Sequence, residues 1–207
     1  VMDTSETGLE KIIVDWLRDK NGYEQATPHD YNKTFALVES WVERFVTTTQ
    51  SDKVKESMCF ASPSERLKFF TRLSGEIGKR GVVDVLRKGY KFNGNTFDLY
   101  YPIPSQLNPS AKAAYKQNIF GVIRQVMYST QNTNEIDFVV FINGLPLATF
   151  ELKNNYTGQT YENAIKQYQT ERDSKDLLLQ KKRCAVHFAV DDQQVWMCTA
   201  LAGKNSW

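Results

Sequence analysis

The sequence predicts a mixed α/β domain, with a central sheet flanked by helices and a helical elaboration near the N-terminus. Apolar residues recur every three or four positions through most of residues 1–88, which is the spacing of amphipathic helices. From residue 89 onward they alternate with polar residues or form short runs, which indicates strands. A further helical stretch, at residues 160–172, separates the last two predicted strands from the others.

The helices are predicted in order from the N-terminus. The opening helix ends at Asn21-Gly22, has potential cap residues at Thr4 and Ser5, and carries an apolar stripe made of Leu9, Ile12, Ile13, Trp16 and Leu17. A second helical stretch covers 35–47, and Ser62-Pro63 opens a third, because both residue types are favoured where helices begin. Residues 33–88 are therefore predicted to be mostly helical.

The sheet is predicted from residue 89 to the C-terminus. A hairpin covers 90–101 around the turn-forming Asn93-Gly94-Asn95. Longer strands follow at 120–128, 136–142 and 147–152, and two more at 184–190 and 195–201, after the helix at 160–172. We interpret residues 1–207 as one domain, with the sheet core at 89–207.

Charge and cysteine content exclude several classes of protein. The 26 basic residues nearly cancel the 24 acidic ones, so any contact with nucleic acid must come from a local patch. Cys59, Cys184 and Cys198 are an odd, widely spaced set, typical of reduced core residues in a cytosolic protein and not of a zinc site. No apolar run reaches the roughly 18 residues that span a bilayer, so we expect no membrane association.

Three charged residues stand inside otherwise apolar strands: Asp137, Glu151 and Lys153. Buried carboxylates are costly unless they are paired or hold a metal. Alternation places Glu151 and Lys153 on one face, but a two-residue Asn143-Gly144 turn with regular pairing would put Asp137 on the other. We therefore predict a three-residue loop, Asn143 to Leu145, which shifts the register by one and sets Asp137 opposite Glu151.

Two carboxylates on neighbouring strands suit Mg²⁺, which keeps several waters and accepts a phosphate oxygen. Such an ion would polarise a scissile phosphate, and Lys153 could orient the attacking water or stabilise the transition state. The spacing alone leaves a second interpretation open, in which Asp137, Glu151 and Lys153 form a partly buried ion-pair network.

The text around these residues is similar to the N-terminal endonuclease domain of the restriction subunit of type I restriction-modification enzymes, a branch of the PD-(D/E)xK nucleases. The similarity covers NIFGVIRQV (118–126), NEIDFVVFINGLPLATFELKN (134–154), AIKQYQTERD (164–173) and KRCAVHFAVD (182–191). It implies a restriction-endonuclease-like mixed sheet, Asp137 and Glu151 as metal ligands, Lys153 as the catalytic lysine, and Glu10 as a further acidic residue near the metal.

The sequence departs from the family pattern in two places. Ile136 replaces the nominal proline, which leaves the carboxylates unaffected. A Gln-x-x-x-Tyr element after the lysine is incomplete, because Gln167 is followed four residues later by Glu171. We still expect Gln167 at the active site, whereas the adjacent Tyr168 is predicted to lie in the core, and His187 is predicted to be structural.

The resemblance implies a Mg²⁺-dependent type I site-specific deoxyribonuclease acting on double-stranded DNA. Its partners would be modification and specificity subunits, and cleavage would depend on an ATP-driven translocase. No Gly-Lys-Ser/Thr phosphate loop occurs here, so we expect this chain to be a fragment that does not itself bind ATP, from a cytoplasmic prokaryotic protein. The alternative is a catalytically silent DNA-binding or assembly module. The predicted DNA contacts are Arg124, Arg172, Lys181, Lys182 and Arg183.

Overall fold

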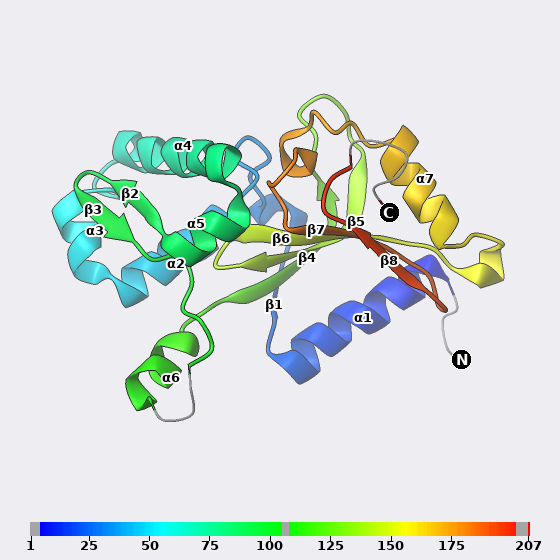
Figure 1. Ribbon diagram of the computed structural model, residues 1–207, viewed down its shortest axis with the longest axis horizontal. Helices are drawn as coiled ribbons and strands as arrows, with labels where there is room; N and C mark the ends of the chain where they lie inside the picture. The colour runs from blue at the N-terminus through cyan, green and yellow to red at the C-terminus, as the bar shows by residue number, and fades with distance from the viewer. Residues whose placement is uncertain (1–4, 105–107, 202–206) are drawn as a thin grey trace.

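The computed structural model describes residues 5–104, 108–201 and 207. Six strands form one mixed sheet in the order β1-β4-β5-β6-β7-β8 (Figure 1). Their bounds are β1 Glu24–Ala26, β4 Phe120–Met127, β5 Glu135–Ile142, β6 Leu145–Leu152, β7 Val186–Val190 and β8 Val195–Cys198. Pairing is parallel for β1 with β4 and for β6 with β7, and antiparallel elsewhere. The mixed α/β prediction is confirmed at this level.

One face of the sheet is covered by α1 (Glu6–Asn21), which lies along it in Figure 1. The Ser5 side chain accepts from Gly8 N, and Gly22 ends the helix at φ 69°, while Thr4 lies outside the described residues. Val14 of α1 packs with buried strand residues, and Phe138, Phe150 and Phe188 stack across β5, β6 and β7 with centroid separations of 4.2 and 4.7 Å. These stacked aromatic side chains make the sheet face that α1 covers apolar.

The other face carries the helical elaboration and α7 (Tyr161–Thr170) (Figure 1). The elaboration consists of α2 Glu39–Thr49, α3 Ser51–Ser57, α4 Pro63–Arg80 and α5 Val82–Lys88, followed by the β2 (Tyr90–Phe92) and β3 (Asn95–Phe97) hairpin. Phe69 on α4 packs edge-on against Tyr90, Phe92 and Phe97. Helices cover most of the region predicted to be helical, but the first of them begins at Glu39 and not at Phe35, and the β2–β3 hairpin follows it.

Shorter elements connect these layers. They are η1 Pro28–Asp30, α6 Pro109–Tyr115, η2 Asn155–Thr157 and η3 Leu177–Leu179. The edge strand β1 was not predicted from the sequence, because its three residues, Glu-Gln-Ala, carry no apolar alternation. None of the helices in the described part of the chain is both long and apolar enough to span a bilayer.

The predicted three-residue loop between β5 and β6 is wrong. Ile142 pairs with Leu145, so the turn has two residues, Asn143 and Gly144, with φ values of 49° and 84°. Both values suit a tight hairpin turn. The Asn143 side chain is buried. It donates to Leu99 O and Asn118 Oδ1 and accepts from Ile119 N, and these hydrogen bonds hold the turn against the segments at Leu99 and at Asn118–Ile119.

A β-bulge supplies the register shift that the loop was predicted to supply. Phe141 pairs with Pro146 but Val140 pairs with Ala148, so Leu147 is the extra residue on β6. Proline has no N–H to donate to the ladder, and bulges are among the few sheet positions that tolerate it. Pro146 is therefore the residue in the sequence that is compatible with a bulge at this point.

Candidate active site

Beyond the bulge, the hairpin register brings Asp137 opposite Glu151. Phe138 pairs with Phe150, and the next residues along each strand are Asp137 and Glu151. Leu152 N donates to Asp137 Oδ2 at 2.6 Å, so this carboxylate occupies the place of a backbone acceptor at the end of the β5–β6 pairing. Asp137 is partly exposed, whereas Glu151 is completely buried. The two carboxylates thus lie opposite each other as predicted, but a β-bulge and not a three-residue loop sets the register.

Glu151 is held by a residue from beyond α7. Arg172 Nε donates to Glu151 Oε1 at 2.6 Å, and Arg172 Nη2 donates to Glu135 O at 2.7 Å. The second carboxylate oxygen, Glu151 Oε2, is buried and has no hydrogen-bond partner among the described residues. Burial, followed by the negative charge of Asp137, raises the pKa of Glu151 to about 8, even though Arg172 and Lys153 act in the opposite direction.

This environment fits a hard cation. A buried carboxylate oxygen without a partner is costly, and a second carboxylate lies across the hairpin. A divalent ion would replace the missing partner and favour the ionised form of Glu151. Within the described residues no cluster of three or more His, Cys, Asp or Glu side chains could hold a metal, so the remaining ligands would have to be water, backbone or substrate oxygens.

Lys153 follows Glu151 by two residues and is nearly buried. Its backbone N–H donates to Val190 O at 2.8 Å, which extends the pairing of β6 with β7. Strand alternation puts its side chain on the Glu151 face, and its positive charge lowers the pKa of that carboxyl. The structure therefore brings Asp137, Glu151 and Lys153 together.

A buried hydrogen-bond network fixes α7 beside this group. The Thr149 hydroxyl lies 2.8 Å from the Tyr168 hydroxyl and 2.7 Å from His187 Nδ1. Burial lowers the pKa of His187 to about 4, so this ring is neutral. Tyr168 is buried as predicted, and Gln167 Oε1 is buried without a hydrogen-bond partner among the described residues. Gln167 is thus in a position where a ligand or water could satisfy it.

Comparison with protein families accounts for nearly the whole chain. A family model described as the type I restriction enzyme R protein N terminus matches residues 3–206. The chain belongs to this family. Comparison with curated proteins found no match. Family membership confirms the similarity to the type I restriction subunit that was inferred from the sequence around the hairpin, and it gives the chain a restriction-related role.

Glu10 does not join the other two carboxylates of this restriction-family domain. Its side chain is nearly buried between α1 and β4, where Arg124 Nε donates to Oε1 at 2.7 Å and Gln125 Nε2 donates to Oε2 at 2.9 Å. Arg124 pairs in register with Phe138, so this ion pair lies on the α1 face, opposite to the face expected for Glu151. The geometry does not support Glu10 as a third metal ligand.

Two of the five predicted DNA contacts are buried. Arg172 is engaged with Glu151, with 5% of its side chain exposed, and Arg183 is 3% exposed, where burial lowers the pKa of its guanidinium. Their burial argues against both residues as DNA contacts in this conformation. Arg124 is part-exposed but paired with Glu10, while Lys181 and Lys182 are exposed.

The partner of Glu151 was the main feature that sequence reasoning missed. Arg172 was predicted to contact DNA, together with Lys181, Lys182 and Arg183. Its position directly after α7 was the available signal, because that helix leads back over the strand that carries Glu151. Nothing local distinguishes an arginine that turns inward from one that faces solvent.

Proposed function

We propose that this chain is a Mg²⁺-dependent endonuclease domain that hydrolyses phosphodiester bonds of double-stranded DNA as part of a type I restriction enzyme. The observation that carries the proposal is Glu151: a buried carboxylate with one oxygen that has no hydrogen-bond partner among the described residues, set across the hairpin from Asp137 and beside Lys153. Membership of the restriction R-subunit family supports the same assignment.

Each side chain has a distinct task in this proposal. Asp137 and Glu151 would hold Mg²⁺, which when bound polarises a phosphate oxygen and lowers the pKa of a water. Lys153 would orient the attacking water or stabilise the negative charge that develops on the phosphate. Gln167, on α7, would position the water or substrate by accepting a hydrogen bond at its buried Oε1.

Cleavage would be coupled to ATP-driven DNA translocation by a motor domain that these residues do not contain. Modification and specificity subunits would complete the complex, and target recognition would belong to the specificity subunit. This domain would accordingly cut without reading sequence.

One observation favours a second candidate, a catalytically silent DNA-binding or assembly module. Arg172 already provides a positive partner for Glu151 at 2.6 Å. A buried ion pair can be purely structural, and breaking such a pair is strongly destabilising. The two candidates differ in one measurable property, because only the nuclease needs a divalent ion at Asp137 and Glu151.

Metal binding separates them. Titration of Mn²⁺ or Mg²⁺ by calorimetry should show a site in the wild type that is lost in Asp137→Asn. The control Asp52→Asn, in the exposed first turn of α3, should bind as the wild type does. Equal binding by wild type and Asp137→Asn would favour the silent module.

Activity is best tested in the reconstituted complex. Lys153→Ala should leave ATP hydrolysis intact and abolish DNA cleavage, because the lysine acts on the phosphate and not on the motor. Retained cleavage would remove Lys153 from the mechanism.

A further inference from the structure

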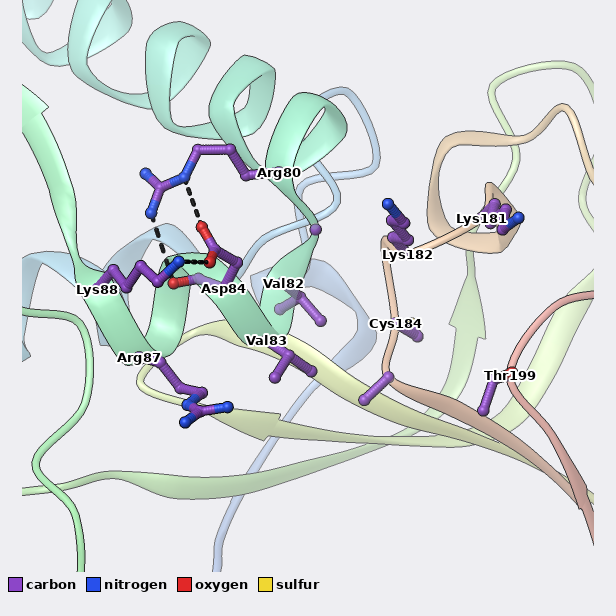
Figure 2. A pocket seen from close by; sticks show the side chains of 12 residues that line it. Arg80, Val82, Val83, Asp84, Arg87, Lys88, Lys181, Lys182, Cys184 and Thr199 are labelled. Atoms are coloured by element: carbon purple, nitrogen blue, oxygen red, sulfur yellow. Dashed lines mark hydrogen bonds and ion pairs between the residues drawn. The ribbon is translucent and has the colours of Figure 1, made fainter.

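A cavity of about 640 Å³ lies between the helical elaboration and the segment that leads into β7 (Figure 2). Residues of α4 and α5 line one side of it, and Lys181 and Lys182 line the other. Neither Asp137, Glu151 nor Lys153 lines it, so it is separate from the candidate active site. We refer to it as the basic pocket.

The basic pocket has a strong excess of positive charge. Its single acidic lining residue, Asp84, is neutralised twice, by Arg80 Nε and by Lys88 Nζ, each at 2.7 Å (Figure 2). Three further cations line the same cavity and have no ion pair among the described residues: Arg87, Lys181 and Lys182. All three side chains belong to exposed residues. Unpaired cations around one cavity are what a polyanion requires.

Backbone contacts join the two sides of the basic pocket. Val82 N donates to Lys182 O at 2.9 Å, so the start of α5 is tied to the segment before β7. Lys182 has a φ of 70°, a backbone conformation that is unfavourable for any residue other than glycine. Its stem packs on Gly81, where an added Cβ would lie 3.1 Å from Lys182 Cβ. These contacts hold Lys182 in an unfavourable conformation at the rim.

The lining also includes apolar side chains, Val82, Val83 and Ala185. A ligand that fits must therefore combine anionic groups with less polar surface. A nucleic-acid backbone has this combination, since its phosphates alternate with sugars. Lysine and arginine side chains are the usual contacts to such phosphates.

The position of the basic pocket relative to Glu151 favours DNA as the source of those phosphates. Ala185 N donates to Leu147 O at 2.9 Å, so the pocket adjoins β6 at Leu147. Glu151 lies four residues further along the same strand, which at about 3.3 Å per residue is roughly 13 Å. Each strand of a duplex presents a phosphate about every 3.4 Å along the axis, so the separation corresponds to about four nucleotides.

We propose that the basic pocket binds the phosphate backbone of DNA about four nucleotides from the bond that the carboxylates would act on. Arg87 makes the helical elaboration part of the DNA-binding surface, together with Lys181 and Lys182. This inference rests on the proposed function, because it takes DNA as the substrate. The basic pocket would be a second contact region, which holds the DNA strand in position relative to Asp137 and Glu151.

The test measures DNA affinity without cleavage. Binding of a fluorescein-labelled duplex to the 207-residue chain is followed by anisotropy in EDTA, over a series of salt concentrations. Arg87→Gln and Lys182→Gln should each weaken binding roughly three- to tenfold and lower the salt slope by about 1, as expected for one lost phosphate contact. Lys112→Gln, an exposed lysine of α6 outside the pocket, is the control and should change neither quantity.

Two outcomes would overturn the proposal. One is a DNA affinity and salt slope that neither pocket variant changes. The other is binding of ATP that both variants lose while DNA affinity stays constant, which would assign the basic pocket to a free nucleotide. Thermal melts of the variants should match the wild type, because the altered side chains are exposed. Because the assay is run in EDTA, it does not depend on metal binding at Asp137. Asp137→Asn, measured in the same assay, should therefore bind DNA as the wild type does, whatever the outcome of the metal titration.

Discussion

Replacing Glu151 with glutamine should stabilise the metal-free protein at alkaline pH. The substitution keeps the size of the side chain, and the amide oxygen can still accept a hydrogen bond from Arg172 Nε, which lies 2.6 Å from Glu151 Oε1. What it removes is the negative charge in a completely buried position. The effect must therefore depend on whether the wild-type carboxyl is ionised.

The pKa of Glu151 gives the size and the pH range of this effect. Its value is raised from an ordinary 4.5 to about 8, with burial as the first cause and Asp137 as the second. Because the folded state holds the proton more tightly, the resulting stability is fully present below pH 4.5 and is lost as pH rises through 8. At about 1.4 kcal/mol for each tenfold change in proton affinity, the loss amounts to roughly 5 kcal/mol.

Urea unfolding in EDTA at pH values from 5 to 9 measures the prediction. The free energy of unfolding of Glu151→Gln relative to wild type should rise by about 1.4 kcal/mol per pH unit between pH 5 and pH 8, and then level off. The control Glu162→Gln removes an exposed carboxylate on α7 and should follow the wild type. Parallel curves for wild type and Glu151→Gln would refute the buried-carboxylate account.

Three further substitutions test the packing of the sheet and the ion pair at Glu151. Gly121→Ala should lower the melting temperature sharply, at a cost of about 1–3 kcal/mol or more, because the new Cβ would lie 2.3 Å from the Trp41 ring; an unchanged melt would contradict the close approach. Asn143→Ala removes three hydrogen bonds at the turn and should cost about 2–4 kcal/mol in urea unfolding, whereas a loss under 1 kcal/mol would mean that water replaces them. Arg172→Met should raise the pKa of Glu151 further, so its destabilisation should be larger at pH 9 than at pH 6; a pH-independent cost would exclude this coupling.

The sequence by itself determined the elements that depend on local patterns. Apolar alternation marked β5 and β6, and helical spacing marked α1 and α7, because these periods follow from backbone geometry alone. Charged residues inside apolar strands singled out Asp137, Glu151 and Lys153, since buried charge is costly wherever it occurs.

The tertiary structure decided how those elements meet. Whether a turn or a bulge shifts the hairpin register depends on contacts that hold the turn, such as the hydrogen bonds of Asn143 to distant backbone and side-chain atoms. Pro146 could have indicated the bulge, but the sequence offers no way to choose between one irregularity and the other when both give the same register.

The tertiary structure also decided that Arg172 turns inward and that Arg87 and Lys182 lie around one cavity. Arg172 meets Glu151 across 21 residues of sequence, and Arg87 shares a cavity with Lys182 although they come from different parts of the chain. Exposed and buried arginines look alike in a sequence, because their charge is compensated by residues that only folding brings near. Local periodicity thus identifies the strands and their unusual charges, and long-range packing decides which charges are paired, buried or available to a ligand.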